Sequence, residues 1–440
     1  MKFMASRTTI VLNIAITSLC TLEYLRLLLL DVQRLIRVRL LKDHSTLKIQ
    51  TFLGKLHLKH SKRMRIAVNT RFLIKGKFEG VGWYTYEILK RMVLSHPEDE
   101  FIFIHDRPLA PEYIFAKNVK SIKTIIPSRH PTLWVLWFEY AIPRILRKLN
   151  ADVFLSFDGH CSVKTDTPTV LVLHDLAYLH YPEEIKDNVL RFYRKYIPQY
   201  IHKAKHIVSV SQHGKQDLLQ QFPNVSPRKI SVVGNGCREI FKPLAASEQQ
   251  VIRNQNTDGN PYFFFVGAVQ PRKNISRLIQ AFDIFAEKHA GVQLLIAGKS
   301  AGKSAGIKEA YEQSKHQNRI KFLGFVEDGI MSRLMAASAA VVYPSLFEGF
   351  GVPVLEAMHC EVPVITTQKS SMSEVAGATA LLVDPKDSKD ISQAMSKIIG
   401  EPALAKKLIE AAKLQRNKYD WDLAAEKMYS VLNDNFRRDG

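Results

Sequence analysis

Two glutamates separated by seven residues, Glu348 and Glu356, stand in the segment with the greatest capacity for chemistry. The apolar run 339–343 ends at a proline before them, and a helical pattern begins at Val352 and Pro353. Because proline fits the first turn of a helix, the segment predicts a strand, a glycine loop and a helix N-terminus. Free N–H groups at such an N-terminus favour a phosphate, and nearby carboxylates can accept hydrogen bonds from sugar hydroxyls.

Two further segments place cations and an imidazole where strands are expected to end. Arg272 and Lys273 follow the apolar run 262–266 and precede a helical pattern, so they could clamp a diphosphate. The alternative for this pair is a solvated basic turn. His174 follows the apolar run 169–173, at the strand end where open α/β sheets bind ligands, although a lone histidine is usually structural.

Glycines 76, 80 and 82 follow the apolar run 65–69 and precede a helical pattern expected from Tyr84. Such glycines let backbone N–H groups approach a phosphate, but glycine-rich β–α loops are also common for structural reasons. Their spacing is not that of the GxGxxG dinucleotide fingerprint. Both a phosphate loop and a structural turn remain open here.

Two other patterns imitate phosphate or metal sites. Residues 298–304 carry glycines one residue too close for a P-loop, and a loop is the simpler interpretation. Asp420 and Asp422 have the spacing of a metal-binding pair, yet they precede a helical pattern at 423–436, where Asp422 would serve as N-cap. We therefore expect no metal site.

Short apolar runs alternate with helical patterns, which predicts parallel sheets with helical crossovers. The predicted strands are 65–69, 101–104, 122–126, 153–157, 169–173, 206–210 and 230–236, then 262–266, 293–297, 320–324, 339–343, 362–366 and 380–383. A polar stretch at 241–260 separates the two groups as an interdomain connection. The predicted fold class is α/β, with two doubly wound parallel sheets facing each other across a hinge.

The chain of 440 residues is 46% hydrophobic and 24% charged, as expected for a globular protein with two cores. Four cysteines without metal-ligand or paired spacing indicate incidental thiols in a reducing compartment: Cys20, Cys161, Cys237 and Cys360. The formal net charge of +20 could attract nucleic acid or an anionic membrane.

Residues 1–63 hold twelve Lys or Arg against three Asp or Glu. Apolar residues between 25 and 36 recur at intervals of three and four residues, with arginines between them. This pattern favours a basic amphipathic helix on an anionic membrane. Two alternatives remain open: translation starts at Met64, or the apolar stretch from Ile10 spans the membrane.

From about Met64 to Phe436 the chain resembles the retaining glycosyltransferases of family 4, the glycosyl transferases group 1, which have the GT-B architecture. The most specific feature is the E-x7-E signature of Glu348 and Glu356. The other matching segments stand in the family's order: Gly80–Gly82, His174–Asp175, Val210–Ser211, Asn235–Gly236, Pro271–Asn274, Leu323–Phe325 and Ser373–Glu374. The resemblance implies two Rossmann-like domains, with the C-terminal helix crossing back onto the first domain.

This resemblance implies an acceptor-side domain at 64–245 completed by 418–440, and a nucleotide-sugar-binding domain at 246–417, after the extension at 1–63. By this resemblance, the protein would transfer a sugar, with retention of its anomeric configuration, from a nucleotide-diphosphate sugar to a glycan or lipid-linked acceptor in surface polysaccharide biosynthesis. His174–Tyr178 and Pro271–Asn274 are similar to the mannosyltransferase-like subset, which makes GDP-mannose a candidate donor. The resemblance implies neither a cofactor nor a metal.

The resemblance also implies a role for each residue on the sugar side. Glu356 would bind the ribose hydroxyls of the donor, and Glu348 would bind the hydroxyls of the transferred sugar. His174 would contact the sugar or stabilise its transition state from the first domain. The loop with Gly80 and Gly82 would let the backbone approach the diphosphate.

On the phosphate side, Arg272 and Lys273 would neutralise the leaving diphosphate. The N–H groups of three residues would meet the phosphate or sugar: Phe350, Gly351 and Val352. The chain departs from the family pattern at Ala268, where many members carry an arginine, so one diphosphate ligand is missing or replaced by Arg272. It departs again at Glu361, where glycine is usual and a side chain should strain a tight turn.

Two other functions stay open at this point. A nucleotide-sugar 2-epimerase uses the same two-domain scaffold. A basic nucleic-acid-binding protein would account for the net charge, although no nucleic-acid module is recognisable. We expect a transferase with no nucleic-acid partner, in the cytoplasm and peripheral at the inner face of the cytoplasmic membrane.

Overall fold

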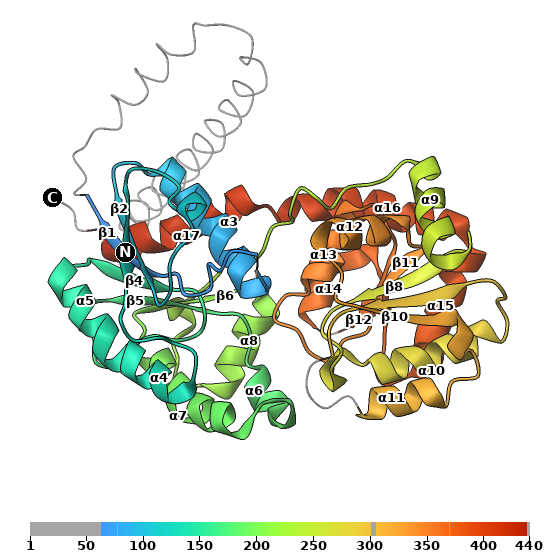
Figure 1. Cartoon of the computed structure of the whole chain (residues 1–440), viewed down its shortest axis with the longest axis horizontal. Coiled ribbons are helices and arrows are strands. Elements are labelled where there is room, and N and C mark those ends of the chain that lie inside the picture. Colours follow the sequence, from blue (N-terminus) through green and yellow to red (C-terminus); the bar gives the residue numbers. More distant parts are fainter. Residues whose placement is uncertain (1–62, 77, 301–304, 369, 438–440) are drawn as a thin grey trace, which may run out of the picture. The chain divides into compact units, whose positions relative to one another are not determined.

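The computed structural model describes residues 63–76, 78–300, 305–368 and 370–437 (Figure 1). The predictions for residues 1–62, including the amphipathic helix and Cys20, lie outside the described residues. Residues 301–304, the end of the apparent P-loop, also lie there. Within the described ranges, every helix is too short or too polar to span a bilayer.

Seven strands form the first sheet in the order β3-β2-β1-β4-β5-β6-β7, and all neighbours pair in parallel. The strands are β1 (Arg65–Asn69), β2 (Glu100–His105), β3 (Val119–Lys123), β4 (Val153–Ser156), β5 (Thr169–Leu173), β6 (His206–Ser209) and β7 (Ile230–Val232). The order reverses at β1, so the crevice outside the carboxyl ends of β1 and β4 is a usual place for a ligand.

Six strands form the second sheet in the order β10-β9-β8-β11-β12-β13, again with parallel pairing throughout. The strands are β8 (Tyr262–Val266), β9 (Gln293–Ala297), β10 (Ile320–Gly324), β11 (Ala340–Tyr343), β12 (Val364–Thr367) and β13 (Leu381–Val383). The order reverses at β8, which pairs with β11. The loops after these two strands therefore leave the sheet side by side, and they carry Arg272, Lys273 and Glu348.

Helices lie on both faces of each sheet (Figure 1), which explains why β2, β5 and β9 are buried along their whole length. The strands of the first sheet and the helices between them form what is called the first segment, and those of the second sheet the second segment. The helices of the first segment are α3 (Gly80–Ser95), α4 (Pro131–Leu136), η2 (Trp137–Ala141), α5 (Ile142–Leu149), α6 (Ala177–His180), α7 (Asp187–Lys203) and α8 (Gln212–Gln221). The later helices are α9 (Ala246–Thr257), α10 (Ile275–Ala286), α11 (Ala305–Glu312), α12 (Asp328–Ala337), α13 (Val352–His359), α14 (Ser371–Ala376), α15 (Ser388–Gly400), α16 (Pro402–Gln415) and α17 (Trp421–Phe436).

Several predicted boundaries were wrong. The third strand is β3, at 119–123 instead of 122–126, because most of this edge strand is exposed and its sequence lacks a clear apolar run. The predicted connection at 241–260 contains the helix α9. The N-cap of α17 is Asp420, whose carboxylate accepts hydrogen bonds from the backbone N–H groups of Asp422 and Leu423; Asp422 is inside the helix.

The helix α17 packs against α3 of the first segment. Its Tyr429 donates a hydrogen bond to Asp99, and Arg437 contacts both oxygens of the same carboxylate at 2.7 and 2.8 Å. Asp99 is completely buried and also accepts a hydrogen bond from the backbone N–H of Met64 at 2.9 Å. The crossing of the C-terminal helix onto the first segment is thus confirmed, and one buried carboxylate holds it there.

Candidate active site

The loop after β11 leads directly into the N-terminus of α13, as the sequence predicted. Gly351 is the residue before the helix and has a φ of 93°, a left-handed conformation that favours glycine. A Cβ there would also lie 2.6 Å from Cγ of Met372, so no side chain fits. Pro353 stands in the first turn, where its missing N–H costs nothing. The loop therefore presents the N–H groups of residues 350–352 at a helix N-terminus.

Glu348 lies within this loop and is surrounded by hydrogen-bond donors. Its Oε1 accepts from Tyr343 Oη at 2.9 Å and Ser345 Oγ at 2.7 Å, and it contacts Lys273 Nζ at 2.5 Å. Its Oε2 lies 3.6 Å from the guanidinium of Arg272. Burial alone would raise the pKa of Glu348, but the charges of Lys273 and Arg272 outweigh burial and hold it below its usual value. Glu348 is therefore an ionised carboxylate between two cations.

Arg272 and Lys273 form a single turn, η5 (Pro271–Lys273), after β8. Asn274 fastens this turn to the β11 loop, because its side-chain amide donates to the backbone carbonyl of Pro344 at 3.0 Å. Arg272 also reaches the first segment: its backbone N–H and its guanidinium both contact the carboxylate of Glu184. The structure brings the two predicted cations to Glu348 and shows that carboxylates, Glu348 and Glu184, balance their charge.

Glu356 lies on α13, with its side chain only 6% exposed, and faces a different partner. Its Oε1 is 3.2 Å from the guanidinium of Arg238, which also contacts Asp328. Burial raises the pKa of Glu356 to about 7, with Arg238 opposing that rise. No sequence pattern marked Arg238; its one signal is its position two residues after the matching Asn235–Gly236 segment.

His174 follows β5, and its ring is held in one orientation. Its Nε2 lies 2.8 Å from the carbonyl oxygen of Phe157, and because a carbonyl only accepts, Nε2 carries the proton. Burial lowers the pKa of His174 below its usual value, so the imidazole is neutral near pH 7 with Nδ1 as acceptor. The ring stands edge-on to Tyr84, with centroids 5.1 Å apart.

The two halves of the site touch at Gly349. A Cβ on this residue would lie 1.9 Å from the carbonyl oxygen of His174, so the β11 loop and the β5 end pack backbone against backbone. Ser211 Oγ donates to the carbonyl oxygen of Gly349 at 2.7 Å, and Glu374 accepts from the backbone N–H groups of Gln212 and His213 at 2.9 Å each. His174 is thus brought to the loop that holds Glu348.

Gly80 and Gly82 lie in the first turn of α3, so the helix starts earlier than the predicted Tyr84. The expectation that they belong to an irregular loop was wrong. A Cβ at Gly82 would be 3.1 Å from the carbonyl oxygen of Phe72, which gives this glycine a packing reason. A Cβ at Gly80 would meet nothing within 4 Å.

The structure shows the surroundings of the two positions where the chain departs from the family pattern. Glu361 has a φ of 57°, which confirms the strained turn, and its carboxylate pairs with Lys413 at 3.1 Å. Next to Ala268, Gly267 lies so close to Gly298 that a Cβ at Gly298 would be 1.8 Å from its carbonyl oxygen. In the described part of the chain, no three His, Cys, Asp or Glu side chains gather as metal ligands.

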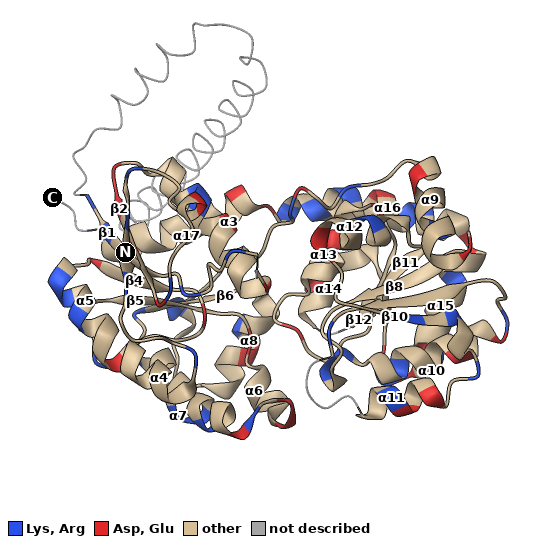
Figure 2. Ribbon diagram, viewed as in Figure 1, with Lys and Arg blue, Asp and Glu red and all other residues tan. Residues whose placement is uncertain are grey.

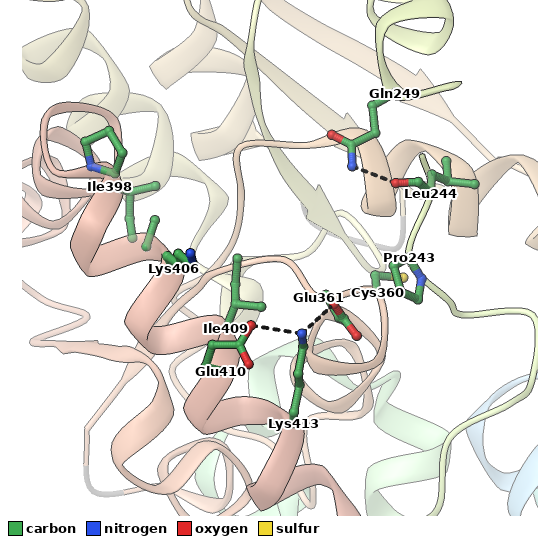
Figure 3. Close-up of a pocket in the computed structure, with 12 residues that line it drawn as sticks. Pro243, Leu244, Gln249, Cys360, Glu361, Ile398, Lys406, Ile409, Glu410 and Lys413 are labelled. Carbon is green, nitrogen blue, oxygen red and sulfur yellow. Dashed lines mark hydrogen bonds and ion pairs between the residues drawn. The ribbon is translucent and has the colours of Figure 1, made fainter. Parts of the chain in front are cut away.

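A hollow of about 460 Å³ lies apart from these residues (Figure 3). It is lined by the connection around Pro243, by the C-terminal end of α13 and by α16. Lys413 in this hollow is paired with Glu361 and Glu410. None of the predicted site residues lines it.

Residues 78–238 match the family described as Glycosyltransferase Family 4, and residues 247–415 match Glycosyl transferases group 1. The O-antigen chain mannosyltransferase B of Escherichia coli is 24% identical over 361 residues, which are 79% of this chain and 94% of that protein. The O-antigen chain mannosyltransferase RfbU of Salmonella typhimurium is 26% identical over 281 residues, which are 64% of this chain and 74% of that protein.

Two solved structures share the fold. Anabaena HepE in complex with UDP-glucose has a TM-score of 0.67 at 17% identity and covers 84% of this chain and 100% of its own. WaaG, a glycosyltransferase involved in lipopolysaccharide biosynthesis, has a TM-score of 0.64 at 17% identity and covers 83% of this chain and 99% of its own. With its two parallel-sheet domains in the GT-B arrangement, the chain belongs to the group 1, family 4 glycosyltransferases.

Proposed function

We propose that this enzyme transfers mannose, with retention of anomeric configuration and without a metal, from a nucleotide-diphosphate sugar to a glycan or lipid-linked acceptor in surface polysaccharide synthesis. The observation that carries this proposal is the ionised Glu348, held between Lys273 and Arg272 before the N-terminus of α13, in the loop whose Gly349 packs on the backbone of His174. Mannose is the sugar named for the relatives of E. coli and S. typhimurium. Those relatives are transferases, so the 2-epimerase is not favoured.

The donor diphosphate binds where Arg272, Lys273 and the N–H groups of Phe350, Gly351 and Val352 converge. As the bond to the anomeric carbon breaks, negative charge grows on the leaving diphosphate, and fixed cations and a helix N-terminus stabilise it. These groups supply the positive charge that a metal ion would otherwise provide.

The transferred sugar lies between Glu348 and His174. The carboxylate accepts hydrogen bonds from sugar hydroxyls, and the neutral imidazole accepts one at Nδ1. The first turn of α3, with Gly80 and Gly82, closes the site from the first domain. In this assignment, residues 64–245 with 418–440 bind the acceptor and residues 246–417 bind the donor.

A panel of nucleotide sugars tests the donor. We expect GDP-mannose to raise the melting temperature more than UDP-glucose, UDP-N-acetylglucosamine or GDP, because only the correct donor fills both the phosphate and the sugar positions. Incubation with UDP-N-acetylglucosamine alone is the control for the epimerase. An epimerised product formed without an acceptor would overturn the transferase proposal.

The Glu356→Gln variant tests the ribose contact. Because Glu356 lies away from the transferred sugar, we expect the donor Kd to rise on the order of 10- to 100-fold, the loss expected for hydrogen bonds to a charged group. Turnover at saturating donor should change much less. Calorimetric titration with the donor measures this, and Glu361→Gln, at the far end of α13, is the matched control. An unchanged Kd would refute the assignment.

We also place the enzyme at the inner face of the cytoplasmic membrane. Residues 1–63 are strongly basic, and Lys and Arg also gather on α5, among them Arg147 and Lys148 (Figure 2). Deleting residues 2–62 should leave donor binding intact but weaken cosedimentation with anionic liposomes, and 0.5 M salt should have a similar effect on the full chain. If the full chain does not cosediment with anionic liposomes, this placement is wrong.

A further inference from the structure

Arg238 joins four segments at the side of the site where Glu356 lies. It stands in the connection between β7 and α9, and its side chain is 11% exposed. The guanidinium contacts Glu356 on α13 at 3.2 Å and Asp328 on α12. It also lies over the ring of Trp83 on α3, 4.6 Å from the centroid, and over Phe241, 5.0 Å from the centroid. Two carboxylates and two aromatic faces therefore fix both the position and the plane of this group.

The surroundings of Glu356 otherwise disfavour a negative charge. The titratable groups that face it are Arg238 and Cys237 from the connection, Asp328 from α12, Tyr343 from β11 and Cys360 after α13. Of these, Arg238 alone is a cation, and it contacts one carboxylate oxygen, Oε1. Asp328 repels a charge on Glu356. The ionised form of Glu356 thus depends on Arg238.

We propose that Arg238 is a positioning residue for donor binding, which holds the Glu356 carboxylate ionised and turns its other oxygen toward the donor ribose. This inference rests on the proposed contact between Glu356 and the ribose. A carboxylate accepts hydrogen bonds from hydroxyls at both oxygens, whereas a protonated acid must use one oxygen as donor. Arg238 reaches the donor only through Glu356 and is not itself a catalytic residue.

The chemistry of arginine is specific here. A planar guanidinium can stack on Trp83 and Phe241 while its N–H groups bridge two carboxylates. A lysine ammonium is not planar and lacks the fixed, forked arrangement of N–H donors. We therefore expect Arg238→Lys to restore part of the function that Arg238→Gln loses. Loss of Arg238 should also raise the pH at which donor binding strengthens, because burial raises the pKa of Glu356 and Arg238 opposes that rise.

The experiment is a titration of the full-length protein with GDP-mannose between pH 5.5 and 9. In the wild type, Kd should fall as the pH rises through about 7, where Glu356 ionises. In Arg238→Gln the fall should move to higher pH; a one-unit shift raises Kd about threefold at pH 7.5 and about ninefold at pH 6, where both proteins are mostly protonated at residue 356. Arg238→Lys should lie between the two. In Glu356→Gln, binding should be weak without a step in this range.

Arg319→Gln is the matched control for a purely structural arginine. Arg319 donates to the backbone carbonyls of Val292, Ala286 and His289 and lies over Phe282, directly before the edge strand β10. Its loss should lower the melting temperature and leave the pH dependence of Kd unchanged. If Arg238→Gln weakens binding equally at every pH, like a structural change, or leaves it intact, the inference is overturned. If Glu356→Gln binds the donor normally, the proposed ribose contact has failed instead.

Discussion

Replacement of Glu348 by Gln is expected to lower kcat roughly 10²- to 10³-fold, the cost of removing one preorganised electrostatic contact in an active site. Gln keeps the shape of the side chain, so the change isolates the charge. In this variant Lys273 loses its carboxylate partner and Arg272 keeps only Glu184, so more positive charge is available to a diphosphate. We therefore expect the donor Kd to stay the same or fall while turnover is lost. Single-turnover transfer assays and donor titrations separate these two quantities.

Ser345→Ala is the control for this variant. It removes one hydrogen bond to Glu348 and keeps both ion pairs, so a loss of about fivefold in kcat is expected for a bond worth about 1 kcal/mol. A Glu348→Gln enzyme with wild-type kcat would show that this carboxylate has no role in transfer. Weaker donor binding with unchanged kcat would assign Glu348 to the nucleotide and not to the sugar.

Replacement of Gly349 by Ala is the second change with a large expected effect. The new Cβ would lie 1.9 Å from the carbonyl oxygen of His174, so backbone, and not a flexible side chain, must shift. The β11 loop must then move away from β5, which separates Glu348 from His174. A displacement of about 1 Å in an active site can cost 100-fold, so kcat should fall by this factor or more. In the proposed function the donor binds mainly to residues 246–417, so donor affinity should fall less than kcat.

Gly400→Ala provides the matched control, since a Cβ at the end of α15 meets nothing within 4 Å. It should leave kcat unchanged and alter stability by less than about 1 kcal/mol. Circular dichroism and the melting temperature show whether Gly349→Ala is folded. A folded Gly349→Ala enzyme with wild-type turnover would mean that the contact with His174 is not made during catalysis.

The sequence predicted the two parallel sheets and the strand, loop and helix around Glu348 because these depend on local patterns. A proline after a buried apolar run and a glycine before a helical pattern act over a few residues. The start of α3 was harder, because glycine has a low helix propensity and the close packing of Gly82 on Phe72 is a tertiary effect. The bounds of the exposed edge strand β3 were also predicted wrongly, because half-solvated strands lack a continuous apolar run.

Partners of the site residues were not predictable in the same way. Arg238 and Glu184 lie 118 and 88 residues from the groups they contact, Glu356 and Arg272. No local pattern marks such pairs, because they depend on how the two sheets are placed against each other. The sequence predicted Glu348, Glu356, Arg272 and Lys273 as site residues, whereas Arg238 and Glu184, which balance two of these charges, are known only from the tertiary structure.

The buried carboxylate Asp99 has a consequence for the order in which this protein can fold during synthesis. Its partners Tyr429 and Arg437 leave the ribosome after the whole second sheet, although Asp99 lies directly before β2 of the first sheet. Until those partners arrive, the Asp99 carboxylate lacks both its cation and the cover of α17, so the first sheet cannot bury it without a large cost. The second sheet can therefore complete its own packing while the first waits, and the domain that is translated first is the last to be finished.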